Sequence, residues 1–464
     1  MAALKLLNRV KEINYIVLER LAERTLAEQY QAMASGGYGY DSNISEWMSL
    51  LLPLAVERGT CIIINMGAMD PLGAREKVLE IASSLGICLS VAVAHETFVI
   101  EPVMKFNEEC ELLSFILFNF LQGISTYLRA APIVACLERY QPNVIITSRV
   151  ADAALFLAPM VYELGWNWDD LELLAQGSVA GYLLECGCQL TGGYFMHPAD
   201  KHWNLSFTNL LDLSLPYAEI LFSGEVCVIK AEEVGDPSAY ITPEVPLSSS
   251  KVLCSGAKPS AHPIPDKLLQ LIPKHCGWKG WSEISYGGYE CVKRAKAAEF
   301  LASLMLDHGW KTFPGVISHI LSYIIGLDSL KAISIDYYIS TWRASEDIRL
   351  RMDGLFQEKK HAQQLVKEFT ALYTDGPAGG GGISTGVKKE IVLEKQLLQR
   401  PSMRQKGVNE DDVKVEIYEV QGIQSLNVVV RIILDGGVNC SRRIDRHGKC
   451  ISDLILCQHV VLPP

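Results

Sequence analysis

The sequence predicts an α/β protein: a mainly parallel sheet domain, then a strand-rich connector and a ferredoxin-like α+β unit. Over residues 1–200, short apolar runs alternate with helical patterns, which is typical of a parallel sheet with right-handed crossovers. Over 201–277, short apolar or alternating runs are separated by Pro-containing turns. Over 278–398, the patterns follow the order β-α-β-β-α-β. Residues 399–464 are predicted to form a linker and an irregular tail.

The composition of the 464 residues is that of an ordinary globular protein, with 49% hydrophobic and 20% charged residues. A net charge of −11, without a Lys/Arg cluster, argues against a nucleic-acid surface. The apolar runs are too short to span a bilayer, and the first residues lack a signal-peptide pattern. The 13 cysteines lack disulfide-framework spacing, so we expect reduced thiols and a cytoplasmic protein.

Four apolar runs predict the strands of the parallel sheet, near residues 15–18, 61–64, 88–94 and 143–147. Helical patterns separate and follow them at Ile44–Glu57, Ala74–Leu85, Thr126–Arg139, Ala153–Glu163 and Leu171–Glu185. The apolar segment Leu112–Phe120 fits either a core helix or an exposed flap. In the connector, strands are expected at Tyr217–Leu221, Glu225–Lys230 and Ser250–Leu253.

The ferredoxin-like unit is expected to begin with a strand around Ser282–Tyr286. The elements predicted after it are a helix at Glu290–Leu306, strands at Ala332–Ser340 and Asp347–Phe356, a helix at Lys359–Tyr373 and a strand at Lys388–Glu394. We expect Asp347–Phe356 to pair antiparallel with Ala332–Ser340.

Polar residues follow two of the buried strands directly. Asn65 comes after the strand at 61–64, and Arg149 follows the strand at 143–147. Parallel strands place their carboxyl ends at one edge, where open α/β sheets hold ligands. We expect Arg149 to hold an anionic group, with Asp152 or Glu185 as the acid/base. A buried Glu185 needs a partner, and Arg149 is the nearest candidate. The alternative is that Arg149 and Asp152 only pair at a helix start.

Glycine-rich turns supply the other candidate residues. Such a turn can present backbone N–H groups to a phosphate or carboxylate, or it can serve as a flexible lid. The segment after Tyr373 lacks the Gly-Lys-Ser/Thr ending of a P-loop. The candidate ligand-binding residues are Asn65, Gly67, Thr191, Gly192, Gly193, Gly376, Gly379, Gly380, Gly381 and Gly382. We expect the loop at 376–382 to meet Arg149, Asp152 and Glu185 in one pocket, with Asn65 on its wall.

Two further motifs are weaker. His95 and Glu96, expected just past a strand, fit either acid–base work or a structural role. Cys186 and Cys188 form a lone pair without a second pair at zinc-site distance, so no metal site is predicted.

Several of these motifs together resemble the acyclic terpene utilization (AtuA-type) family, formerly a domain of unknown function. The matching segments, in family order, are Leu18-Glu19-Arg20-Leu21-Ala22-Glu23-Arg24-Thr25, Ile64-Asn65-Met66-Gly67-Ala68, Ile146-Thr147-Ser148-Arg149-Val150-Ala151-Asp152, Leu184-Glu185-Cys186-Gly187 with Thr191-Gly192-Gly193-Tyr194-Phe195, Glu283-Ile284-Ser285-Tyr286 and Gly376-Pro377-Ala378-Gly379-Gly380-Gly381. They cover residues 12–398. The resemblance implies a role near branched acyl-CoA or terpenoid acid breakdown, without an established reaction.

The chain departs from that family pattern at both ends. A Gly-x-Gly-Phe-x-Gly-Asp turn does not precede Glu12, and Cys440–Pro464 does not reproduce a Ser-Gly-Asp-Lys-Gly motif. We therefore expect a form shortened at the N-terminus, without a recognisable small C-terminal domain.

The leading hypothesis from the sequence is an enzyme of hydratase, lyase or isomerase type acting on a branched acyl-CoA or terpenoid carboxylate. The alternative is a non-catalytic subunit or degenerate enzyme that serves as a binding or scaffold protein. Nucleotide-cofactor binding lacks its fingerprint, so no particular cofactor is predicted. We expect a small-molecule partner such as an acyl-CoA, no nucleic acid and no membrane span. The sequence leaves a homo-oligomer open.

Overall fold

The chain divides into two compact units. A computed structural model describes residues 2–100, 124–191, 214–231, 245–246, 251–262, 267–310, 315–317, 320–327, 347–399, 418–419, 426–436, 443–444 and 450–451. The first unit comprises Met1–Ile272 and Glu394–Pro464, and the second comprises Pro273–Leu393.

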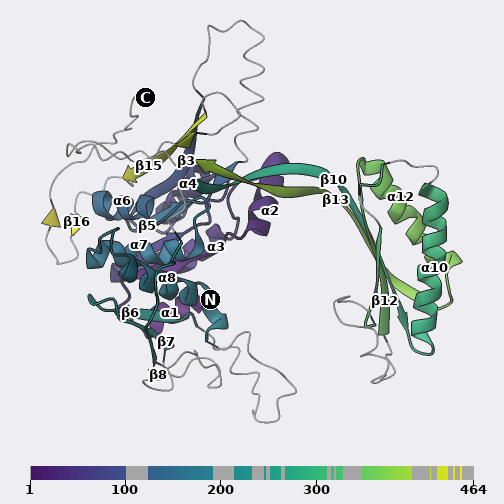
Figure 1. The fold of residues 1–464 in the computed structure, drawn as a ribbon, viewed down its shortest axis with the longest axis horizontal. Helices are drawn as coiled ribbons and strands as arrows, with labels where there is room; N and C mark the ends of the chain where they lie inside the picture. The colour runs from purple at the N-terminus through teal and green to yellow at the C-terminus, as the bar shows by residue number, and fades with distance from the viewer. Residues whose placement is uncertain are drawn as a thin grey trace, which may run out of the picture. The chain divides into compact units, whose positions relative to one another are not determined.

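The first unit contains the predicted parallel sheet (Figure 1). Its strands are β1 (Tyr15–Leu18), β2 (Cys61–Ile64), β5 (Val144–Thr147) and β3 (Ser90–Ile100), in the spatial order β1-β2-β5-β3. Each neighbouring pair among them is parallel. Every residue of β2 and β5 is buried, as expected of short apolar runs covered on both faces. The predicted α/β class is confirmed.

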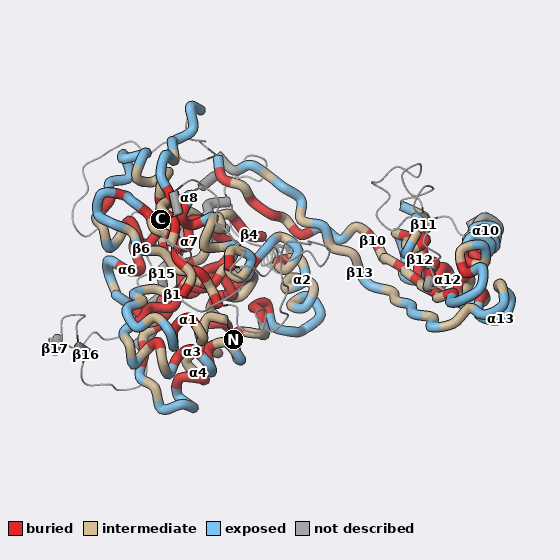
Figure 2. The backbone as a smooth tube through the Cα atoms, turned by 90° about the horizontal axis from the view of Figure 1, so that it is seen from below, coloured by how far each residue is buried: buried red, intermediate tan, exposed pale blue. Residues whose placement is uncertain are grey.

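Helices cover both faces of this sheet, so the unit has two hydrophobic cores. On one face, α3 (Ile44–Arg58) and α4 (Pro71–Ser84) pack against Ile62 and Ile64. On the other face, α6 (Ala131–Tyr140) and α7 (Asp152–Leu164) pack against Ile63. The division follows from the alternation of side chains along a strand. In Figure 2 the buried positions, drawn in red, gather along these strands and helices.

The sheet extends into the part of the chain predicted as an irregular tail. β15 (Leu426–Gly436) pairs antiparallel with β3 along its whole length. β3 is therefore longer than predicted, and His95 lies inside it, opposite Arg431, rather than just past its end. A strand whose partner is distant in sequence gives little local signal, which is why the prediction of an irregular tail was wrong here.

The strand-rich connector forms a separate antiparallel sheet within the first unit. Its strands are β6 (Tyr217–Ile220), β7 (Val226–Ile229), β9 (Lys251–Cys254) and β8 (Val245–Pro246), in the spatial order β6-β7-β9-β8. It packs on α8 (Leu171–Glu185), where Gln176 Nε2 donates to the carbonyl oxygen of Cys254 at 2.6 Å.

The second unit has the predicted β-α-β-β-α-β order. Its elements are β10 (Lys267–Gly287), α10 (Cys291–Trp310), β11 (Leu321–Ile325), β12 (Asp347–Phe356), α12 (Lys359–Thr370), α13 (Leu372–Asp375) and β13 (Gly380–Gln399). Both long strands begin or end in the first unit. The spatial order is β13-β10-β12-β11, and both helices pack on the face that carries Ile284, Tyr286 and Leu350.

The structure bears on two predictions about the second unit. Among the described residues, β12 pairs antiparallel with β10 and with β11, whereas the predicted partner, Ala332–Ser340, lies outside them. β13 starts at Gly380, so Gly380, Gly381 and Gly382 begin a strand rather than end a loop. Gly382 nevertheless has a left-handed φ of +62°. The segment Leu112–Phe120 also lies outside the described residues.

Candidate functional site

Polar side chains from three neighbouring parallel strands meet at one edge of the sheet, which we call the rim. Glu19, Asn65 and Arg149 follow β1, β2 and β5 respectively. Asn65 is fully buried, and its Oδ1 accepts from the backbone N–H groups of Arg20 at 2.8 Å and Leu21 at 3.2 Å. Its Nδ2 donates to Glu19 Oε1 at 2.9 Å. Asn65 therefore fixes the turn after β1 and orients the Glu19 carboxylate.

Arg149 lies at the centre of the rim, and only 4% of it is exposed. Its Nη1 donates to Asp152 Oδ1 at 2.5 Å and to the carbonyl oxygen of Val150 at 3.1 Å. Its Nη2 donates to the Tyr127 hydroxyl at 3.0 Å, and Glu19 Oε1 lies 3.7 Å from Nη1. Among the described residues, its Nε has no hydrogen-bond partner. Both terminal nitrogens are thus committed to groups of the protein itself.

The helix that Asp152 begins also favours a carboxylate at this position. Asp152 is the first residue of α7, and a carboxylate is favoured in the first turn of a helix by the backbone dipole. The pairing of Arg149 with Asp152 at the start of a helix is the alternative role that the sequence left open for both residues.

A chain of hydrogen bonds continues from Arg149 through residues that the sequence did not single out as a site. The Tyr127 hydroxyl donates to Glu23 Oε1 at 3.1 Å, and Lys395 Nζ lies 2.7 Å from the same oxygen. The hydrogen bond from Lys395 lowers the pKa of Glu23, against the opposing effect of burial. Burial raises the pKa of Tyr127. Tyr127 precedes α6, whereas the sequence predicted it inside a helix at Thr126–Arg139. The local sequence pattern therefore did not indicate that Tyr127 contacts Arg149.

Glu185 ends α8 close to the acidic part of the rim. Its pKa is raised by burial and then by the negative charges of Asp152 and Glu19, with Arg149 acting in the opposite direction. The ion pairs of Arg149 go to Asp152 and Glu19. The structure therefore brings Arg149, Asp152, Glu185 and Asn65 into one neighbourhood of the first unit and adds Glu19 to them.

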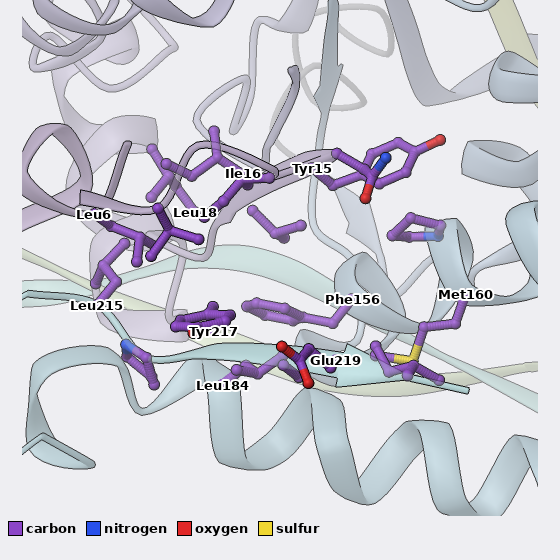
Figure 3. A pocket seen from close by; sticks show the side chains of 18 of the residues that line it. Leu6, Tyr15, Ile16, Leu18, Phe156, Met160, Leu184, Leu215, Tyr217 and Glu219 are labelled. Carbon is purple, nitrogen blue, oxygen red and sulfur yellow. The ribbon is translucent and has the colours of Figure 1, made fainter. Parts of the chain in front are cut away.

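A cavity of about 680 Å³ runs beside β1 (Figure 3). Its lining includes the acidic end of the rim. β1 is the outermost strand of its sheet among the described strands, and β6 lies across the cavity from it. Most of the wall is apolar, with Leu6, Ile16, Phe156, Met160, Leu184 and Leu215 among its residues. Glu19 and Glu185 both line it. Sequence reasoning missed this cavity, because its walls come from five separate parts of the chain.

Two of the candidate ligand-binding residues in the first unit have packing roles. A Cβ on Gly67 would lie 2.7 Å from the carbonyl oxygen of Thr147 and 2.9 Å from Pro71 Cα, so glycine lets two strand ends approach. Thr191 is buried, and its hydroxyl donates to the carbonyl oxygens of Cys188 at 3.2 Å and Ser214 at 2.8 Å. Gly192 and Gly193 lie outside the described residues.

The glycine segment at 376–382 belongs to the second unit. Arg294 holds it there, because its Nη1 donates to the carbonyl oxygen of Ala378 at 2.8 Å. A Cβ on Gly376 would lie 2.3 Å from the carbonyl oxygen of Leu372, and Gly379 has a φ of +79°. The segment thus needs glycine for its own backbone at these two positions. Its meeting with Arg149 stays a prediction.

The described part of the chain offers neither a metal-binding cluster nor a membrane-spanning helix. No group of three His, Cys, Asp or Glu side chains in it is arranged to hold a metal ion. None of its helices combines the length and apolar character needed to cross a bilayer. Burial raises the pKa of both Cys186 and Cys188, which disfavours the thiolate that metal ions bind.

Comparison with known proteins gives two family matches. The model described as "Acyclic terpene utilisation family protein AtuA" matches residues 1–408, and the "AtuA ferredoxin-like domain" matches residues 383–461. The second match covers most of the segment expected to be a linker and irregular tail without a recognisable small domain, and it corrects that expectation. It overlaps the predicted ferredoxin-like unit at 278–398 only over 383–398. No curated protein and no solved structure matches the chain.

Proposed function

The chain belongs to the acyclic terpene utilisation family, AtuA, and on that basis we propose that it is an enzyme acting on a branched or terpenoid acyl chain. The hydrocarbon binds in the cavity beside β1, and Glu185 exchanges a proton with it. The reaction is of hydratase, lyase or isomerase type, since each of these requires a proton to be delivered and another removed.

The observation that carries this proposal is that two carboxyl groups, Glu19 and Glu185, line the rim end of a cavity whose wall is mostly apolar. Small-molecule sites typically measure about 300–1,000 Å³ and have mainly apolar walls with few polar groups. The cavity of about 680 Å³ is within that range. Apolar walls favour a hydrocarbon ligand because burying its surface removes it from water.

The two carboxyl groups have different surroundings, which suits them to different roles. Burial and the neighbouring carboxylates raise the pKa of Glu185, so that it retains a proton more readily than an exposed glutamate. Glu19 accepts from the Asn65 amide at 2.9 Å and lies 3.7 Å from the Arg149 guanidinium, so it has an amide donor and a cation beside it. Carboxyl groups in contrasting environments are typical of acid–base pairs. In the proposal Glu185 donates the proton and Glu19 stabilises the developing positive charge.

Arg149 has a positioning role in this proposal rather than the anion-binding role expected from the sequence. Its terminal nitrogens contact Asp152, Tyr127 and Val150, and it does not appear among the cavity-lining residues. Asp152 in turn raises the pKa of Glu185. Arg149 and Asp152 therefore position the acid–base pair without lining the cavity themselves.

The test combines thermal melting with product analysis. We expect acyclic terpenoid alcohols, carboxylates or acyl-CoA thioesters with ten-carbon branched skeletons to raise Tm by several degrees, because a ligand stabilises the state it binds. Glu185→Gln should keep the shift and reduce turnover at least about 100-fold. Glu172→Gln, at an exposed position on the same helix, is the matched control and should change neither. If a compound raises Tm but the wild-type protein converts none of the compounds, the non-catalytic alternative is supported instead.

A further inference from the structure

All the carboxylate side chains that line the cavity belong to glutamates. They are Glu12, Glu19, Glu163, Glu185 and Glu219, and the described lining includes no lysine, arginine or histidine. A buried or half-buried anion needs a counter-charge or several donors, because its loss of water is otherwise uncompensated. The walls of this cavity offer an anion no side-chain cation.

Three cations near the cavity contact other groups. Lys251 Nζ lies 2.5 Å from Glu219 Oε2, and Glu219 is one of the lining glutamates. Arg149 directs its terminal nitrogens to Asp152 and Tyr127. Arg58 donates from Nη1 to the carbonyl oxygen of Val10 at 3.3 Å. Each of these three cations thus contacts a group of the protein itself.

The glutamates lie at both ends of β1, so an anion would meet a carboxylate in either orientation. Glu12 and Glu163 are exposed and lie near the start of β1, where the Tyr15 hydroxyl donates to Glu163 Oε1 at 2.5 Å. Glu19 and Glu185 are half-buried at the strand's carboxyl end. The stretch between them is apolar, with Ile16 and Leu18 on the strand and Phe156 opposite (Figure 3).

We propose that the substrate occupies this cavity as an uncharged acyclic terpenoid alcohol, and that the glutamate lining discriminates against free carboxylates and coenzyme A thioesters. The inference rests on the proposed function and narrows its substrate class. A hydroxyl can donate to the Glu19 carboxylate and accept from a protonated Glu185, so both groups find partners. A carboxylate offers acceptors only and repels Glu19, and coenzyme A adds several phosphate charges that must pass exposed glutamates.

The experiment measures the dissociation constants of three compounds with one ten-carbon acyclic skeleton: the alcohol, the free carboxylate and the coenzyme A thioester. With the full-length protein at neutral pH and low salt, we expect the alcohol to bind at least about 10-fold more tightly than either anion. Raising the salt concentration should narrow the gap, because salt screens the repulsion at the exposed end.

A charge-neutral variant provides the second arm. Glu12→Gln combined with Glu163→Gln keeps the side-chain shapes and an acceptor for Tyr15, and it removes two negative charges at the exposed end. It should tighten binding of the carboxylate and the thioester by about 3- to 10-fold and leave the alcohol unchanged. Glu172→Gln, outside the lining, is the control for overall charge. Melting of each variant without ligand checks its fold.

The outcomes separate this inference from the proposed function. If the carboxylate or the thioester binds the wild-type protein as tightly as the alcohol, the inference is overturned and the proposed function stands. The same holds if the double variant leaves the preference unchanged. If none of the three compounds binds, both proposals are wrong.

Discussion

At the scale of single residues, the guanidinium of Arg149 connects the polar residues of the rim. It joins Asp152 on α7, Tyr127 before α6 and Glu19 after β1, which are distant from one another in the sequence. Its packing over the Tyr127 ring, at 4.4 Å from the ring centroid, adds a cation–π contact. A lysine cannot replace it fully, because an ammonium group lacks the planar fork that bonds two groups at once.

Replacing Arg149 tests whether it is structural. We expect Arg149→Ala to lower the free energy of unfolding by about 3 kcal/mol, because Asp152 and Glu19 are left without their cation. Arg149→Lys should lose less, since it retains the charge. Urea unfolding followed by circular dichroism gives both values. Unchanged stability combined with a loss of ligand-induced stabilisation would instead restore the anion-binding role expected from the sequence.

At the scale of elements, the approach of strand ends determines what fits at the rim. The turn after β2 passes so close to the end of β5 that a side chain at Gly67 would overlap the backbone of Thr147 and Pro71. Gly381, by contrast, has no atom within 4 Å of the position a Cβ would take. Both glycines were candidate ligand contacts by sequence, and the structure gives them different surroundings.

Alanine substitutions distinguish these two glycines. Gly67→Ala should destabilise the protein by about 1–3 kcal/mol, because backbone atoms cannot move aside as a flexible side chain would. Gly381→Ala is the matched control and should change stability by less than about 0.5 kcal/mol. Denaturant unfolding measures both. If Gly67→Ala is as stable as the wild type, the backbone around this turn can move to accommodate a Cβ, and the prediction is wrong.

At the scale of the whole molecule, segments from both ends of the sequence complete the first unit. β15 adds a strand to the central sheet, and Lys395 near the end of β13 contacts Glu23 at the start of α2. Through Tyr127, that ion pair connects to Arg149. The rim is thus supported by a part of the chain that follows the entire second unit.

The ion pair between Lys395 and Glu23 predicts a pH dependence. The folded-state pKa of Glu23 lies below its ordinary value of 4.5, so its stabilising contribution is present above that value and is lost as the pH falls through the folded-state value. Glu23→Gln should therefore lower stability near neutral pH by at most about 1 kcal/mol, because the pair is partly exposed and screened. The difference from wild type should vanish in acid. Thermal melts from pH 7 to pH 3 test this, and a difference that persists at the acid end would contradict it.

The sequence by itself determined those features that depend on nearest neighbours along the chain. The four buried strands of the parallel sheet, the helix at Leu171–Glu185 and the β-α-β-β-α-β order all follow from local apolar periodicity. The position of Asn65 and Arg149 after two of these strands followed as well, because neighbouring parallel strands end at one edge. The family resemblance was also readable from short motifs, and the family match confirms it.

The tertiary structure alone decided which groups face one another. The cavity beside β1, the contacts of Arg149 with Tyr127 and Glu19, and the pairing of β15 with β3 join segments far apart in the sequence. Local periodicity carries no information about such contacts, because they form only when whole elements pack. The same reason explains why Glu19 and Glu185 emerge as a pair only in the folded chain. Glu19 begins the turn after β1, and Glu185 ends a helix that follows β5 in the sequence.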